Sequence, residues 1–408
     1  MTSVSTTRDL RFASALSTAA DTRQAAIEVC HATAERLNSP ADLAVAFASP
    51  HHAENFDALT SALAERTGAR VLLGVTGESI VATAREIEGQ PAVSLWLASL
   101  PGAEIHPLRL EFERTPEGGT FVGWPDELAG EWPAGAALIL QGDPFSFPAD
   151  LLLERLNEDR PGVPVLGGMA SGGHSPGENR LLLGRNVWEQ GAVGALVSGP
   201  LSVRAVVSQG CRPIGRPFIV TKAEQNVILE LGGRPPLAQL QEVFDKLSTR
   251  EQKLAQQGLH VGRVVNEYQG QFARGDFLVR NCIGADRQTG AIAIGDFVRP
   301  GQTVQFHVRD AQTADEDLRE LLLASRQAGH ETRGALLFTC NGRGTRLFDR
   351  PHHDASVLAE VLGDVPVAGF FAQGEMGPIG GKNFLHGFTA SAALFGPAGE
   401  GGDEGRRG

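Results

Sequence analysis

Residues 335–339 read ALLFT and residues 365–374 read VPVAGFFAQG, and the segment that these runs enclose decides the fold. A polar loop, 340–353, follows the first run, and residues 354–362 carry apolar side chains at helical spacing. Short runs that are apolar throughout are typical of strands covered on both faces, and a helical crossover makes two such strands parallel. The segment therefore predicts a β-loop-α-β unit that ends in a glycine loop.

The pattern occurs a second time without a gap. Residues 137–140 (ALIL) and 163–166 (VPVL) are the predicted strands, residues 149–157 the helix, and residues 167–173 the glycine loop. Pro, Val, Gly, Ala and Gly recur at matching positions of the two copies, which indicates an internal duplication.

A third, shorter copy is predicted from residues 43–48 (LAVAFA), helix 53–66 and strand 71–73. The glycine loops lead into strand-like runs, such as 180–184 and 388–395, and not into helices. A dinucleotide-binding unit needs a helix directly after its glycine loop, so that class is disfavoured. We expect an α/β fold with mixed β-sheets flanked by helices and built from duplicated β-loop-α-β units.

The rest of the chain is organised around these copies. Residues 8–38 predict one or two helices, residues 237–256 one helix after two prolines, and residues 260–308 a β-rich stretch. The expected division is an N-terminal helical segment (1–34), two α/β domains (35–232 and 233–396), and a disordered tail (397–408).

Composition excludes several functions. The net charge is −12, without a basic block, which disfavours binding to nucleic acid or to an anionic membrane. No apolar run is long enough for a membrane span or a secretory signal. The four cysteines are widely spaced, which favours a reducing, cytoplasmic compartment. Glycine is abundant, 50 of 408 residues, but has no collagen period and instead serves turns and loops.

Four segments carry a resemblance to a known family: SQGCRPIG (208–215), VRPGQTVQFHVRDAQTADEDL (298–318), LFTCNGRG (337–344) and GFFAQGEMGPIGGKNFLHGFTAS (369–391). With them the chain resembles the FIST family (F-box and intracellular signal transduction proteins), with a FIST N-terminal domain at 35–232 and a FIST C-terminal domain at 233–396. The resemblance implies a stand-alone sensory protein that binds a small, amino-acid-like ligand and signals through a protein partner. It implies no catalytic residues and no cofactor.

Ligand-binding candidates lie in two of these motifs. Arg343 offers a bidentate fork for a carboxylate, and Asn341 offers an amide for a polar group. Glu375 suits a ligand ammonium. The full set of ligand-binding candidates is Cys340, Asn341, Arg343, Gln373, Glu375, Asn383 and His386, with Cys211 and Arg212 from the N-terminal domain.

Other readings of these residues stay open. Asn341-Gly342 is also typical of a turn, and Arg343 could simply pair with an acid. Cys340 is a weak candidate for a nucleophile with His386 as its base, which makes a cysteine-dependent enzyme the first alternative. A protein-interaction scaffold without a ligand is the second. The His51-His52 and His352-His353 pairs match in position, but adjacent histidines seldom chelate one ion, so no metal site is expected.

Overall fold

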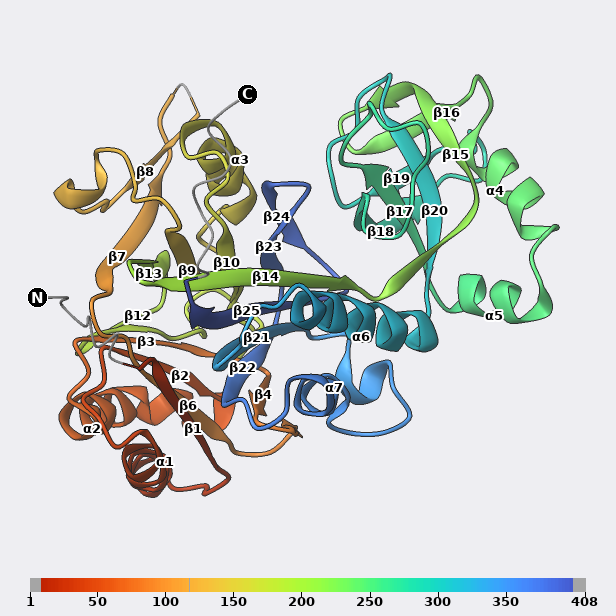
Figure 1. Ribbon diagram of the computed structural model, residues 1–408. Coiled ribbons are helices and arrows are strands. Elements are labelled where there is room, and N and C mark those ends of the chain that lie inside the picture. The colour runs from red at the N-terminus through yellow and green to blue at the C-terminus, as the bar shows by residue number, and fades with distance from the viewer. Residues whose placement is uncertain (1–8, 117, 399–408) are drawn as a thin grey trace, which may run out of the picture. The chain divides into compact units, whose positions relative to one another are not determined.

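The computed structural model describes residues 9–116 and 118–398, so most of the predicted tail, 397–408, lies outside the described residues. The chain divides into two compact units (Figure 1). The first, which we call the three-sheet unit, comprises residues 1–207, 319–385 and 390–408, and the second, the barrel unit, comprises 208–318 and 386–389. The boundaries between the units fall within three strands and one helix. The domain division expected at residue 233 stays a prediction.

Each sheet of the three-sheet unit is built on one of the predicted β-loop-α-β units. The parallel pairs are β2 with β3, β9 with β10, and β21 with β22, and the neighbouring strands are antiparallel. The expectation of an α/β fold with mixed sheets is confirmed. In sheet order, the strands are β1 (Arg11–Ser17), β6 (Val93–Ser99), β2 (Leu43–Ala48), β3 (Val71–Thr76), β11 (Leu181–Leu183) and β12 (Asn186–Trp188); then β24 (Lys382–His386), β23 (Glu375–Ile379), β10 (Val165–Met169), β9 (Ala137–Gly142), β13 (Ala192–Ser198), β7 (Glu104–Glu113) and β8 (Thr120–Val122); then β14 (Leu201–Gln209), β25 (Thr389–Pro397), β21 (Gly334–Cys340), β22 (Val367–Ala372), β4 (Ser79–Ala82) and β5 (Arg85–Glu88).

The glycine loops connect the sheets in a cycle. The hairpin β4–β5 follows β3 but pairs with β22, the hairpin β11–β12 follows β10 but pairs with β3, and β23–β24 follows β22 but pairs with β10. Each repeat thus lends its hairpin to the sheet of another repeat. This exchange explains why strands, and not helices, follow the glycine loops.

Helices cover the outer faces of these sheets. The crossover helices are α2 (Phe56–Thr67), α3 (Ala149–Asp159) and α7 (His353–Leu362), and α1 (Thr22–Leu37) packs on β1 and β6. The boundary between the two units falls within α6 (Ala311–Gln327). Asp21 caps α1 by accepting a hydrogen bond from the amide of Gln24 at 2.8 Å. Short 3₁₀ turns are Pro50–Asn55, Asp126–Leu128 and Gly344–Arg346.

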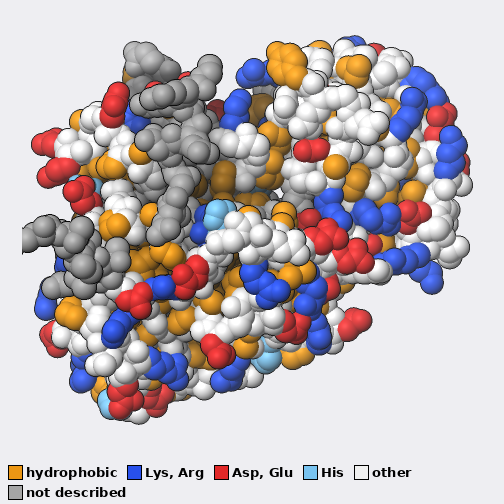
Figure 2. All heavy atoms as spheres, in the orientation of Figure 1, with side chains coloured by type: hydrophobic (Ala, Val, Ile, Leu, Met, Phe, Trp, Pro, Cys, Tyr) orange, Lys and Arg blue, Asp and Glu red, His pale blue; other side chains and the backbone are white. Residues whose placement is uncertain are grey.

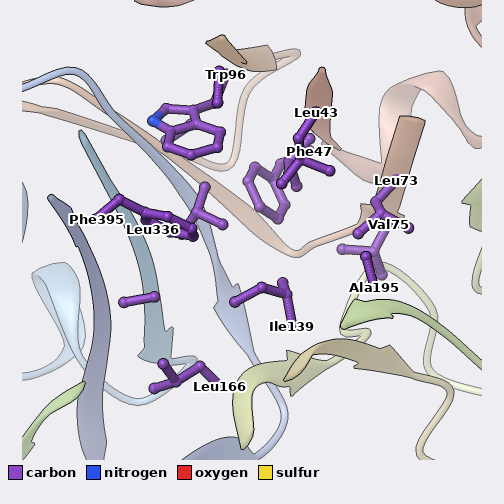
Figure 3. Close-up of a cluster of buried hydrophobic side chains, with 14 of the residues drawn as sticks. Leu43, Phe47, Leu73, Val75, Trp96, Ile139, Leu166, Ala195, Leu336 and Phe395 are labelled. Carbon is purple, nitrogen blue, oxygen red and sulfur yellow. The ribbon is translucent and has the colours of Figure 1, made fainter. Parts of the chain in front are cut away.

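One hydrophobic core joins the three sheets. Phe47, Ile139 and Leu336 come from the first strand of each repeat, and all three are fully buried (Figure 3). The Phe47 ring lies 5.4 Å from that of Phe370, and Trp96 lies 5.0 Å from Phe395. The loops at the strand ends therefore follow strands whose side chains are held in one closely packed core.

Two helix predictions are wrong. Residues Arg11–Ser17 form β1 and not helix, because they pair antiparallel with β6 along their whole length. The single helix expected over 237–256 is two helices, α4 (Pro236–Phe244) and α5 (Thr249–Gln257). Ser248 interrupts it by forming a capping box with Glu251, which begins a new helix.

The barrel unit is a closed barrel with α4 and α5 packed on it. Its strands in order are β15 (Cys211–Glu224), β16 (Val227–Leu231), β19 (Ile292–Ile294), β18 (Phe277–Ala285), β17 (Leu259–Val264) and β20 (Thr303–Arg309). Apolar side chains from these strands fill its interior, among them Phe218 and Phe306, whose rings lie 5.9 Å apart. In chain order, the barrel lies between β14 and β21, two strands of the sheet that is built on residues 335–374.

Candidate functional site

The candidate site lies at the C-terminal ends of β21 and β22 in the three-sheet unit. Cys340 pairs with Ala372 at the end of the parallel ladder, and the Asn341 amide donates to the Ala372 carbonyl at 3.0 Å. Gln373, the next residue, is exposed. The fold thus brings Cys340, Asn341 and Gln373 together, at the edge where open α/β sheets carry ligand loops.

Arg343 occupies the interior of this loop. It is fully buried, and it donates from Nε and Nη2 to the two carboxylate oxygens of Asp354, each at 2.7 Å. The guanidinium carbon lies 5.3 Å from the centre of the Phe348 ring. Arg343 therefore pairs with a buried acid at the start of α7, where the sequence suggested a ligand carboxylate or a surface acid.

Asp354, in the first turn of α7, contacts several side chains of the loop and of β21. Besides Arg343, the Thr339 hydroxyl donates to Asp354 Oδ2 at 2.6 Å, and His353 Nδ1 lies 2.9 Å from Oδ1. The His353 ring stacks on Phe348 at 3.4 Å. The sequence suggested Asp354 as a helix cap, but His352 precedes the helix instead, with a left-handed φ of 64°.

Glu86, from β5 of the first repeat, completes the buried cluster. Its Oε1 accepts a hydrogen bond from the Ala355 amide in the first turn of α7 at 2.9 Å. Its own amide donates to His352 Nδ1 at 3.0 Å. A carboxyl group at a helix N-terminus meets free amides and the positive end of the helix dipole, so the borrowed hairpin is fastened to α7.

Two further carboxylates hold the outer part of the loop. Glu78 pairs with Arg346, and Glu88 accepts hydrogen bonds from the amide and hydroxyl of Thr345. Gly344 has a φ of 58°, and a Cβ there would lie 2.7 Å from the Phe371 ring. Only glycine fits at this position without a shift of its neighbours.

The charges in the cluster compensate one another. Burial lowers the pKa of Arg343, but the Asp354 carboxylate outweighs burial and the net shift is upward. Burial likewise opposes ionisation of Asp354, yet Arg343 brings its pKa well below the ordinary range. Glu86 has no such partner, so burial and the nearby Asp354 charge raise its pKa to about 8. The cluster is thus a buried ion pair beside an acid whose ionisation is strongly disfavoured.

Three buried polar atoms of this cluster have no hydrogen-bond partner within the described residues: Arg343 Nη1, Glu86 Oε2 and Asn341 Oδ1. Buried polar groups are nearly always satisfied, so such atoms mark places where water or a ligand completes the bonding. Arg343 Nη1 is a donor and Asn341 Oδ1 is an acceptor, and the two residues lie two positions apart in the chain. This pairing fits a ligand that carries both kinds of group.

The other predicted residues of the three-sheet unit lie nearby in sequence but have different settings. Glu375 is buried at the start of β23, opposite Gly168 of β10. Asn383 accepts from the Val165 amide and donates to the Val163 carbonyl, both at 2.8 Å, so both ends of its amide are engaged within the chain. Asn383 fastens the β23–β24 hairpin as Glu86 fastens β4–β5.

His386, Cys211 and Arg212 belong to the barrel unit. Cys211 is buried beside Val264 and Phe277, and Arg212 pairs with Glu251 at 2.9 Å and Asp310 at 3.4 Å. Their sharing of one pocket with Arg343, and the pairing of Cys340 with His386, stay predictions.

Among the residues of the site to which the sequence did not point are Glu78, Glu86, Glu88 and Thr339. Glu86 and Glu88 lie some 250 residues before the loop that they contact. The signal that could have found them is the acidic hairpin after the first glycine loop, once the hairpin exchange is known.

Other kinds of site find little support in the part of the chain that the structure describes. No group of three metal-ligating side chains occurs there, and no helix is long and apolar enough to cross a membrane. Acidic and basic side chains intermix on the face drawn in Figure 2, and its described residues form no continuous basic surface.

Comparison with known proteins agrees with the resemblance. Residues 42–234 match the FIST N domain and residues 236–378 match the FIST C domain. An uncharacterized protein of Mycobacterium tuberculosis strain H37Rv is 47% identical over 391 residues, which cover 95% of this chain and 100% of that protein. An uncharacterized protein of Mycobacterium bovis is 45% identical over 389 residues, or 95% of this chain and 99% of that one.

The chain therefore belongs to the FIST family, whose domains are generally sensory domains of signal transduction. The site at the ends of β21 and β22 lies within the FIST C match, whereas Glu78, Glu86 and Glu88 lie within the FIST N match.

Proposed function

We propose that this protein is a sensor that binds a small amino-acid-like ligand at the Cys340–Gly344 loop and passes the signal to a protein partner. The observation that supports this most is the unmet bonding of Arg343 Nη1 and Asn341 Oδ1 at the end of the parallel strands. A ligand carboxylate would accept from Arg343, and a ligand ammonium would donate to Asn341. Gln373 would contact the exposed side of the ligand.

The chemistry suits modest affinity and good selectivity. Because Asp354 already neutralises Arg343, a ligand carboxylate would gain a hydrogen bond, and the ligand's own ammonium would have to balance its charge. The buried surroundings penalise ligands that leave these atoms unpaired. Because Glu78, Glu86 and Glu88 hold the same loop, a ligand that moves the loop would also shift the β4–β5 hairpin, and a partner could detect that change.

Binding of the twenty amino acids is the direct test. For the amino acid that fits, we expect the free energy of unfolding to rise by about 2.7 kcal/mol at a concentration of about 100 times Kd. Thermal-shift screening followed by calorimetry measures this. Asn341→Ala should weaken binding about tenfold, because one hydrogen bond in a buried site is lost.

Gln256→Ala, which removes an amide at an exposed position of α5, provides the control for Asn341→Ala and should bind like the wild type. The absence of any stabilisation by the panel, on a folded sample, would contradict the proposal. Equal affinity in Asn341→Ala and the wild type would place the ligand elsewhere.

A cysteine-dependent function is the second candidate, and one local observation favours it. Cys340 is partly exposed, and the Gly342 amide points to its sulfur at 3.5 Å. Glu78 chiefly raises the pKa of Arg346, and negative charge on Cys340 adds to this effect. A thiol near cationic groups and an amide donor has the setting of a nucleophile.

Selective alkylation tests this candidate. With limiting iodoacetamide at pH 7.5, we expect Cys340 to react at least tenfold faster than Cys30, because burial raises the pKa of Cys30 to about 11. Burial also raises the pKa of Cys282, which is the stricter comparison because that thiol is partly exposed. Peptide mass mapping gives the four rates, and the unfolded protein gives their intrinsic values. A Cys340 rate no higher than that of Cys282 would rule the nucleophile out.

A further inference from the structure

The barrel unit carries a groove that none of the above uses. It has a volume of about 440 Å³ and lies against β15, with α4 and α5 as its other walls. It begins at Gly215, the last residue of the SQGCRPIG motif. Gly215 has a φ of 65°, and a Cβ there would lie 2.7 Å from the Val243 side chain, so glycine keeps β15 close to α4.

The floor of the groove is apolar. Phe218 and Val243 are buried there, and Leu247 is partly buried. These side chains also belong to the core of the barrel, which fixes their positions. An apolar ligand body placed there would remove from water its own apolar surface and that of the partly buried Leu247.

The acidic side chains on the walls of the groove have ion-pair partners. Glu242 is paired with Arg234 at 2.7 Å, and Glu251 with Arg212 at 2.9 Å, and both of these arginines lie outside the lining of the groove. The hydrogen bond from the Ser248 amide, together with Arg212, lowers the pKa of Glu251 to about 2. Both acids thus already have an arginine partner.

The two basic side chains of the groove have no such partner. Among the described residues, neither Arg216 nor Lys246 forms an ion pair, although both lie near enough to Glu242 to help lower its pKa. Arg216 instead lies over the Phe218 ring at 5.0 Å. The groove therefore offers two positive charges above an apolar floor, which suits an anionic group attached to an apolar body.

A buried amide adds a third feature. Gln239 lines the groove and is 3% exposed. Its Nε2 donates to the Leu231 carbonyl at 3.0 Å, but its Oε1 has no partner within the described chain. A ligand N–H or O–H would satisfy that acceptor.

We propose that this groove binds an amphipathic organic anion. Its apolar body lies on Phe218, Val243 and Leu247, its anionic group lies between Arg216 and Lys246, and its N–H or O–H donates to Gln239 Oε1. This site is independent of the one at the Cys340–Gly344 loop, since every residue that forms it belongs to the barrel unit.

The probe is 8-anilinonaphthalene-1-sulfonate, which combines a sulfonate, an aromatic body and an N–H donor. Calorimetry with the full-length protein should give one binding site per chain. The double variant Arg216→Gln/Lys246→Gln should weaken it at least tenfold. The matched control, Lys222→Gln/Lys253→Gln, removes the same charge from exposed positions outside the groove and should stay within twofold of the wild type.

A second probe separates the contribution of the anionic group to binding from that of the apolar body. N-phenyl-1-naphthylamine has the same body without the sulfonate, and we expect it to bind at least tenfold more weakly to the wild type and equally to both double variants. Circular dichroism checks that every variant is folded. Equal binding of the sulfonate to the two double variants, or no binding to the wild type, would overturn the proposal.

Discussion

Replacing Arg343 with Met should lower the free energy of unfolding by about 3–5 kcal/mol, the usual result of breaking a buried ion pair from one side. The side chain is fully buried, and its loss strands the Asp354 carboxylate, which is 1% exposed. Thr339 and His353 would still contact Asp354, but neither replaces the charge. Urea unfolding followed by circular dichroism measures the change through the midpoint at constant slope.

Two further variants make the result specific. Arg346→Met removes an exposed arginine of the same loop that pairs with Glu78, and it should cost no more than about 1 kcal/mol. The double variant Arg343→Met/Asp354→Leu removes both charges, and we expect it to recover about 2 kcal/mol, because no charge is left buried alone. A loss below about 1 kcal/mol in Arg343→Met would mean that water reaches the pair and that the loop is not the closed cluster described above.

The repeats could be predicted from the sequence because their strands are buried on both faces. Runs such as LAVAFA and ALLFT leave no polar face that would allow another structure, and the observed strands lie within a few residues of the predicted ones. The helix predicted at Arg11–Ser17 was wrong for the opposite reason. Its alanines and serines pack equally well on a helix or a strand, and only pairing with β6, some 80 residues away, decides between them.

The residues of the candidate site also divide into those that the sequence could place and those that it could not. Cys340, Asn341 and Gln373 could be placed together because consecutive parallel strands end at the same edge. The partner of Arg343 could not be chosen, since Asp349 in the loop and Asp354 just after it are both close in sequence, and the sequence does not say which is buried. Glu86 was out of reach altogether, because it arrives through the exchange of a hairpin between repeats.

The same hairpin predicts a pH dependence. Glu86 has an ordinary pKa of 4.5 and a pKa of about 8 in the folded protein, where burial, Asp354 and Glu88 oppose its charge, and the Ala355 amide and Arg343 favour it. Between these values the folded protein keeps a proton that the unfolded chain has released. Stability from Glu86 is therefore fully present below about pH 4.5 and is lost as the pH rises to about 8.

Comparison of the wild type with Glu86→Gln isolates this effect. Gln resembles the protonated acid and can still accept from the Ala355 amide, so the variant should lack the loss between pH 5 and pH 8.5. We expect the stability of the wild type relative to Glu86→Gln to fall by a few kcal/mol over that range, at about 1.4 kcal/mol per unit of pKa shift as an upper limit. Gln90→Ala, at an exposed neutral position just after β5, should keep a constant difference from the wild type at every pH. If the difference between wild type and Glu86→Gln is also constant, Glu86 is ionised at neutral pH in the folded protein. Arg343 Nη1 would then donate its hydrogen bond to Glu86 and not to a ligand.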